Sequence, residues 1–206
     1  MAGTKRLPRA VREQQMLDAA IAEFSDNGYA ETSMDTIAAR AQISKPMLYL
    51  YYGSKDELFT ACIERESGRF LEIMSGGFDP DLRQRDQARI LVREFLRYVY
   101  EHAASWRVLY RVASSSAGFS DAVTRSRGQI TEMITELIRR GTTVDGASDV
   151  DFELTAVALV GASEAVADRI SEGDVSIDRA TELLMGIIWR GLQGVGSGPD
   201  SAAPED

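Results

Sequence analysis

The sequence predicts an all-α protein of about nine helices. Apolar residues recur at intervals of three and four in segment after segment, which is the spacing of one helix face. Serine or threonine precedes several of these segments and an acidic residue follows three positions later, as in the capping boxes that begin helices. No segment shows the strict apolar–polar alternation of a half-buried strand. The pattern therefore argues against β and α/β folds.

The composition is that of an ordinary globular protein, with 206 residues, 44% hydrophobic and 27% charged. No apolar run approaches the roughly 18 residues that span a bilayer, and no signal-peptide pattern opens the chain, so we expect a cytoplasmic protein without a membrane partner. One cysteine, Cys62, and one histidine, His102, argue against a disulfide framework and against a metal site. We expect no cofactor.

Charge is unevenly distributed along the chain. Residues 1–55 carry 7 Lys+Arg and 6 Asp+Glu, a net charge of +1, and the remaining 16 and 26 in residues 56–206 give −10. A neutral-to-basic N-terminal part on an acidic body suits a protein that contacts a polyanion with one end.

The first predicted helix covers Arg9–Asn27 and ends at Gly28, a residue suited to a left-handed helix end. Residues 1–8 before it have no apolar periodicity and should form a mobile arm. Four cationic residues precede the apolar stripe of this helix. They are candidates for phosphate or minor-groove contact, or simply belong to a solvated terminus: Lys5, Arg6, Arg9 and Arg12.

Two short helices around a turn follow, as in a helix-turn-helix DNA reader. Thr32 and Ser33 can both cap the first, and Thr32–Asp35 fits a capping box. Gln42-Ile43 forms the turn. The second short helix begins after Ser44, with Pro46 in its first turn, where the missing N–H costs nothing.

Further helices are expected to the end of the chain. Ser54–Glu57 fits another capping box and begins a helix that runs to Met74 and is broken by Gly76-Gly77. Residues 142–150 read as a polar loop and residues 195–206 as a disordered tail. The other expected helices cover 81–102, 106–113, 119–140, 151–171 and 176–192.

Residues 12–59 resemble the tetracycline-repressor (TetR) family of transcription regulators. The resemblance lies in R-x-x-x-x-L-D-A-A-x-x-x-F-x-x-x-G-Y, T-S-M-D-x-I-A and I-S-K-P-M-L-Y-x-Y-Y-x-S-K-D-E-L. It implies a three-helix DNA-binding domain at 1–57 and a ligand-binding and dimerisation domain at 58–194. Many members have glycine in the turn where this chain has Gln42, and a non-glycine residue in the left-handed conformation costs roughly 1–2 kcal/mol.

The recognition helix of such a motif presents its first residues to base edges in the major groove. Lys45 can donate to guanine or to phosphate, and Pro46 or Met47 can contact a thymine methyl group. We expect Tyr49 and Tyr51 at the DNA and Tyr52 in the core. The DNA-contacting candidates on this helix are Ser44, Lys45, Pro46, Met47, Tyr49 and Tyr51.

Three further candidates lie at helix starts. Lys55 is expected to bind phosphate there, because a cation opposes the helix dipole and its presence calls for another role. Thr32 and Ser33 are expected to cap a helix, bind phosphate, or do both.

The body is expected to bind a small lipophilic molecule. Its candidate lining residues are Phe95, Tyr98, His102, Trp106, Tyr110, Phe119 and Met133. An aromatic residue at helical spacing also fits plain core packing, and that alternative stays open for each. A ligand that favours a differently spaced dimer would shift the population away from DNA.

A homodimer is expected through 151–171 and 176–192, in part because the resemblance implies it. Small residues on the first, Ala158, Gly161, Ala162 and Ala165, allow close approach, and Leu183, Leu184, Ile187, Ile188 and Leu192 form an apolar face on the second. Burial within one subunit can also account for part of this apolar surface. The function predicted is a ligand-released repressor that binds a palindromic operator. The alternatives are an activator of the same family, or a helical enzyme or interaction module without DNA binding. No catalytic motif is present.

Overall fold

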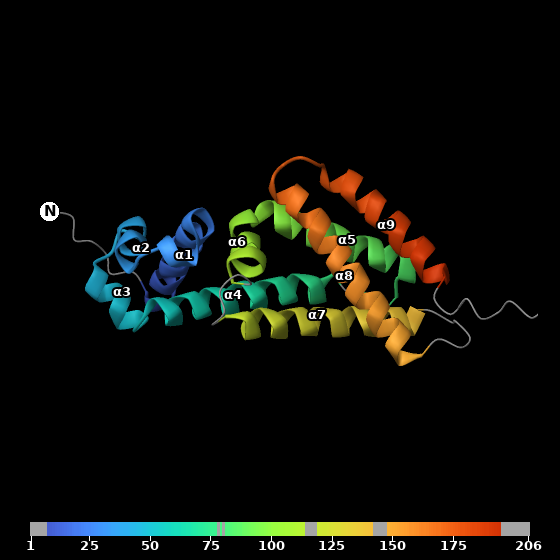
Figure 1. Ribbon diagram of the computed structural model, residues 1–206, viewed down its shortest axis with the longest axis horizontal. Coiled ribbons are helices and arrows are strands. Elements are labelled where there is room, and N and C mark those ends of the chain that lie inside the picture. Colours follow the sequence, from blue (N-terminus) through green and yellow to red (C-terminus); the bar gives the residue numbers. More distant parts are fainter. Residues whose placement is uncertain (1–7, 78, 80, 114–118, 142–147, 195–206) are drawn as a thin grey trace, which may run out of the picture. The chain divides into compact units, whose positions relative to one another are not determined.

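The computed structural model describes residues 8–77, 79, 81–113, 119–141 and 148–194. Within these ranges all regular structure is helical, which confirms the all-α prediction (Figure 1). The elements are α1 (Arg9–Glu31), α2 (Met34–Arg40), α3 (Lys45–Tyr51), α4 (Lys55–Gly76), α5 (Gln84–Glu101), α6 (Ala103–Arg107), the π-helix η1 (Val108–Val112), α7 (Ser120–Gly141), α8 (Asp149–Ser171) and α9 (Ile177–Gly194). None of the described helices is long and apolar enough to cross a membrane.

The chain divides into two compact units. Unit 1 comprises Met1–Arg69 and His102–Arg125, and unit 2 comprises Phe70–Glu101 and Ser126–Asp206. The domain boundary expected after residue 57 lies inside unit 1, because α6 and η1 pack on α1. The arm at 1–7 and the tail at 195–206 lie outside the described residues.

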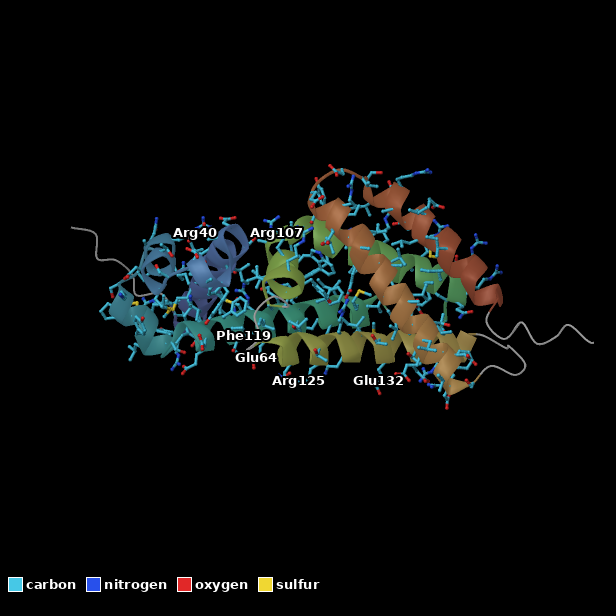
Figure 2. The ribbon with its side chains drawn as sticks, in the orientation of Figure 1. Arg40, Glu64, Arg107, Phe119, Arg125 and Glu132 are labelled. Atoms are coloured by element: carbon cyan, nitrogen blue, oxygen red, sulfur yellow. The ribbon has the colours of Figure 1, made fainter. Side chains whose placement is uncertain are left out.

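Unit 1 is built on one apolar core that joins its first four helices. The stripe expected on α1 is buried, and Ile37, Leu48 and Phe59 contribute fully buried side chains from α2, α3 and α4. Arg40 ties the end of α2 to α1 from outside the core, because its guanidinium pairs with Glu23 at 2.7 Å and with Asp26 at 3.1 Å (Figure 2). The core and these ion pairs fix α2 and α3 as one rigid element.

The turn between α2 and α3 is a Schellman motif. The Ile43 N–H donates to the Ala38 carbonyl at 3.0 Å and the Gln42 N–H to the Ala39 carbonyl at 3.1 Å, which satisfies two carbonyls at the helix end. Gln42 has φ 55°, so the left-handed conformation is taken by a residue with a Cβ. The free-energy cost of a non-glycine residue in the left-handed conformation, expected from the sequence, therefore applies at Gln42.

Helix boundaries differ from the predictions in two places. Gly28 has φ 76° and ψ 173° inside α1, so the expected break exists, but a further helical turn to Glu31 follows it. The expected single helix 106–113 is instead α6 followed by η1. There the Ala113 N–H donates to the Val108 carbonyl at 2.9 Å, five residues back.

Unit 2 packs α5, α8 and α9 against one another (Figure 1). Phe152 and Ala156 of α8 join Ile138 of α7 in one apolar cluster. Ion pairs link Arg89 to Glu182 and Arg93 to Asp178, so α5 and α9 are also joined at the surface. The Ser148 hydroxyl caps α8 in a capping box with Asp151, which places the start of this helix two residues earlier than expected.

Candidate nucleic-acid interface

Ser33 and not Thr32 begins α2. The Ser33 hydroxyl accepts from the Thr36 N–H at 3.1 Å, and the Thr36 hydroxyl accepts from the Ser33 N–H at 3.3 Å. The expected capping box at Thr32–Asp35 is therefore shifted by one residue. Threonine fills the place of the usual glutamate because its hydroxyl reaches the same N–H.

Thr32 is an inward-facing residue. Its side chain is 2% exposed, and its hydroxyl donates to the Gly28 carbonyl at 2.6 Å. The Gly28 carbonyl belongs to the kinked end of α1, where carbonyls lack helical hydrogen-bond partners. The hydroxyl thus has a structural role, and phosphate binding by Thr32 stays a prediction.

The outer surface of α3 carries a group of exposed side chains that we call the reading face: Ser44, Lys45, Pro46, Tyr49 and Leu50. Ser44 occupies the expected N-cap position, but its side chain makes no capping hydrogen bond. Pro46 lies in the first turn as expected. Leu48, on the opposite side of the helix, is 0% exposed. One side of α3 therefore holds the core while the other is open to a partner.

Met47 and Tyr51 are less open than expected. Both are half-buried and pack against the unit 1 core, as Tyr52 does. The Arg9 guanidinium lies 5.4 Å from the centre of the Tyr51 ring, in cation–π range. Tyr52 fits its expected core position, and burial raises its pKa. Met47 keeps part of its surface open, and its contact with a thymine methyl group stays a prediction.

Lys45 of the reading face forms an ion pair with Asp35 of α2. Its Nζ lies 2.8 Å from the Asp35 carboxylate of α2, and both side chains remain about half exposed or more, at 48% and 65%. The hydrogen bond that Lys45 donates to Asp35 raises the pKa of Lys45, which keeps it charged. An exposed pair of this kind contributes little to stability, so Lys45 can exchange Asp35 for a base or phosphate at little cost.

The Lys55 ammonium group is hydrogen-bonded to the backbone of unit 1. Its Nζ donates to the carbonyls of Tyr29 at 2.9 Å, Thr32 at 3.0 Å and Ala30 at 3.4 Å, and lies 4.4 Å from the centre of the Tyr29 ring. The Tyr29 hydroxyl in turn donates to Asp56. The expected phosphate contact is thus replaced by a structural role, in which a cation satisfies the last carbonyls of α1.

Two family models match most of the chain. The model of bacterial regulatory proteins of the tetR family matches residues 16–62, which include α2, α3 and the start of α4. The model of the tetracyclin repressor-like C-terminal domain matches residues 85–191. The chain belongs to the TetR family. It is a transcriptional regulator, and α2–α3 is its DNA-binding helix-turn-helix.

Named relatives and solved structures agree with this family. A TetR-like transcriptional regulator from Rhodococcus sp. RHA1 is 54% identical, with a TM-score of 0.82 over 92% of this chain and 100% of that chain. The transcriptional activator FasR of Mycolicibacterium smegmatis is 29% identical over 92% of this chain and 87% of its own length. The repressor SCO4008 of Streptomyces coelicolor is 39% identical over 77 residues, 37% of this chain and 38% of its own.

Two residues at or beside the reading face of this TetR-family protein, Leu50 and Asp35, were not predicted from the sequence to contact DNA. Leu50 is 82% exposed, although apolar residues on a short amphipathic helix are expected to face inward. Its spacing from Leu48 carried the signal, because residues two apart on a helix point in different directions. Asp35 was counted as a capping residue, and its contact with Lys45 depends on how α2 crosses α3.

The expected ligand residues divide between the two units of this TetR-family chain. In unit 2, Phe95 and Tyr98 pack on Phe70 with ring centres 5.9 Å and 5.0 Å away. In unit 1, Trp106 stacks on Tyr110 at 3.8 Å. His102 sits at the N-cap position of α6.

Phe119 also belongs to unit 1. Its ring lies 4.7 Å from that of Phe59 and 5.0 Å from that of Tyr29, which places it in an aromatic cluster (Figure 2). Phe119 therefore contributes to the packing that also holds the start of α4.

Unit 2 contains an open groove with a volume of about 270 Å³. Its floor is apolar, and Glu136 and Arg140 form an ion pair at 2.7 Å beside it. The groove is lined by Met74, Ser75, Leu91, Met133, Glu136, Leu137 and Arg140. Of the seven expected ligand residues Met133 alone lines this groove, and ligand binding by the other six stays a prediction.

Proposed function

We propose that this regulator binds a palindromic operator as a homodimer and represses transcription until a lipophilic molecule binds unit 2. The observation that carries the dimer is an exposed apolar stripe on α8. Its members are spaced as one helix face: Leu154, Val157, Ala158, Gly161 and Ala165. Leu154 is 62% and Val157 52% exposed. Exposed faces of this kind mark interaction sites.

The apolar face of α9 continues this stripe only in part. Leu183 and Ile187 are 53% and 48% exposed, whereas Leu184 and Ile188 are buried in unit 2 at 1% and 7%. Part of the broad apolar face expected on α9 is therefore buried within the subunit, since adjacent residues on a helix lie on different sides. The side chain of Leu192 lies outside the described ones. The proposed dimer thus uses one row of α9 together with α8.

Two copies of the reading face match the symmetry of a palindrome. Each half-site lies about 34–36 Å from the other on one side of the duplex, so the dimer sets the distance at which both α3 helices can bind. A molecule that binds better to a differently spaced dimer lowers operator affinity by mass action. The open groove beside Met133 has an apolar lining, which supports the proposal of an apolar ligand in unit 2.

The repressor proposal has a specific alternative. FasR, which covers 92% of this chain, is named an activator, whereas the named repressor SCO4008 matches 77 residues. In vitro transcription from an operator-bearing promoter separates the two: a repressor lowers the transcript yield as protein is added, and an activator raises it.

The effector proposal is tested with palmitate and decanol as lipophilic probes. Either is expected to release the protein from operator DNA in a fluorescence anisotropy assay. Met133→Trp fills the groove and should abolish the release without changing DNA affinity. Leu82→Trp, at an exposed leucine that does not line the groove, serves as the control. Unchanged DNA binding with both probes would overturn the lipophilic effector and leave the DNA-binding assignment intact.

A further inference from the structure

Leu50 is the most exposed large apolar side chain among the described residues. At 82% it exceeds Leu154 of the proposed dimer face, which is 62% exposed. A leucine in this state leaves nearly all its apolar surface in water, and burial of that surface is favourable. Burial of the Leu50 side chain against a partner would therefore stabilise a complex.

Leu50 continues an apolar row that begins with Pro46. Residues four apart on a helix lie one above the other, so exposed Pro46 and Leu50 share one row. Lys45 and Tyr49 form the neighbouring row by the same spacing. The reading face thus carries an apolar row beside a row that ends in an ammonium group and a phenol hydroxyl.

We propose that Leu50, together with Pro46, reads thymine by contact with its C5-methyl group in each half-site. This deepens the DNA recognition described above and rests on α3 lying in the major groove. There the methyl group is displayed only by A·T pairs, and apolar side chains are the groups that recognise it. Leu50 is therefore a specificity-determining residue, while Lys45 supplies the charge.

Helix and DNA dimensions set the spacing of the two contacts. Four residues advance about 6 Å along a helix, and successive bases on one strand are about 3.4 Å apart. The thymines read by Pro46 and Leu50 are therefore expected about two base steps apart.

A methyl group fits Leu50 better than a protein surface does. Protein docking sites are contiguous apolar patches of several hundred Å², whereas the exposed neighbours of Leu50 on α3 include the charged Lys45 and the polar Ser44. A cation beside a single apolar row is unfavourable for a dry protein interface and favourable near phosphates.

The test uses the full chain and DNA selected by it from a duplex library with a randomised centre. Each thymine of the selected half-site is then replaced by deoxyuridine, which lacks only the C5-methyl group. We expect two positions at which deoxyuridine weakens binding about fourfold, the effect of one apolar carbon. In Leu50→Ala one of these positions should lose its sensitivity, while the Pro46 position keeps it.

Leu82→Ala is the matched control, because it removes an exposed leucine outside α3. It should retain both sensitive positions, and the thermal midpoint of Leu50→Ala should equal that of the wild type. The proposal is overturned if the wild type tolerates deoxyuridine at every position, if the selected half-sites lack thymine, or if Leu50→Ala retains both sensitivities.

Discussion

The exposed surface of α3 and the exposed surfaces of α8 and α9 make different demands on a partner. On α3 and its N-cap Ser44, one ammonium group, two hydroxyls and two apolar side chains are exposed, which suits a wet, charged groove such as that of DNA. On α8 the exposed row is apolar or small throughout, which suits a second copy of itself. The comparison teaches that exposure alone does not assign a surface. The mixture of chemistries around the exposed residue does.

The lysines of unit 1 repeat this lesson on a smaller scale. Lys45 and Lys55 both stand first in their helices. One reaches a single carboxylate at the surface, and the other reaches three backbone carbonyls. Both lysines have the same local position, at the first residue of a helix. The groups that the fold places beside each lysine therefore decide which one is available to DNA.

The largest effect is expected from charges placed on the α8–α9 face. Leu154→Asp with Leu183→Asp should weaken self-association by at least about 1,000-fold, since each copy would bury two carboxylates without partners. Light scattering should then show a monomer. Tyr100→Asp, at 61% exposure on α5, is the control and should leave the mass unchanged. A double variant that stays dimeric would place the interface elsewhere.

Replacement of Lys55 should act on stability. Lys55→Met removes hydrogen bonds from a charged donor to three carbonyls and should lower the free energy of unfolding by about 2 kcal/mol. The salt dependence of DNA binding should not change, as titrations at several salt concentrations can show. Lys45→Met should do the reverse, lowering the salt slope by about one charge with the thermal midpoint retained. The opposite assignment of the two effects would restore Lys55 as a phosphate contact.

Gln42→Gly should stabilise the protein by about 1 kcal/mol. Its φ of 55° is strained for a side chain with a Cβ and is unstrained for glycine. The gain is partly offset by the entropy of glycine in the unfolded chain. Urea denaturation measures the difference. Gly28→Ala, at φ 76°, is the converse and should destabilise. Stability that falls in Gln42→Gly would mean that the glutamine side chain contributes to the turn.

Asp35→Asn should raise affinity for non-specific DNA a few-fold. It removes a carboxylate that competes with phosphate for Lys45 and repels the DNA backbone, while keeping the shape of the side chain. The comparison is made with a random duplex at two salt concentrations. Asp26→Asn, which contacts Arg40 away from Lys45, is a matched control. Equal affinities for wild type and Asp35→Asn would show that Asp35 is neutral in DNA selection.

The smallest effect should appear at high pH. Partial burial and the hydrogen bond to Asp56 raise the pKa of Tyr29 from its ordinary value of 10.0 to about 12. A raised pKa means that the folded state holds the proton more tightly, so this contribution to stability is complete below pH 10 and is lost as pH rises toward 12. Denaturation of the wild type and of Tyr29→Phe across this range measures it. Identical pH profiles would contradict it.

The sequence by itself determined the helices and the motif. The periodic apolar residues, Pro46 and the serine caps depend on neighbours within four positions, so the all-α fold and the positions of α2 and α3 followed from local chemistry. Leu48 inward and Tyr49 outward followed from helix geometry in the same way. The match of 12–59 to the TetR pattern was predictable because it is also contiguous.

Only the tertiary structure decided the partners of individual side chains. Lys55 and Asp35 lie 26 and 10 residues from the groups they contact. The division of Leu183 from Leu184 depends on which side of α9 faces α5 and α8. Helix periodicity gives each residue a direction but not what lies there. The role of a side chain is decided only when packing places a carbonyl, a carboxylate or solvent beside it.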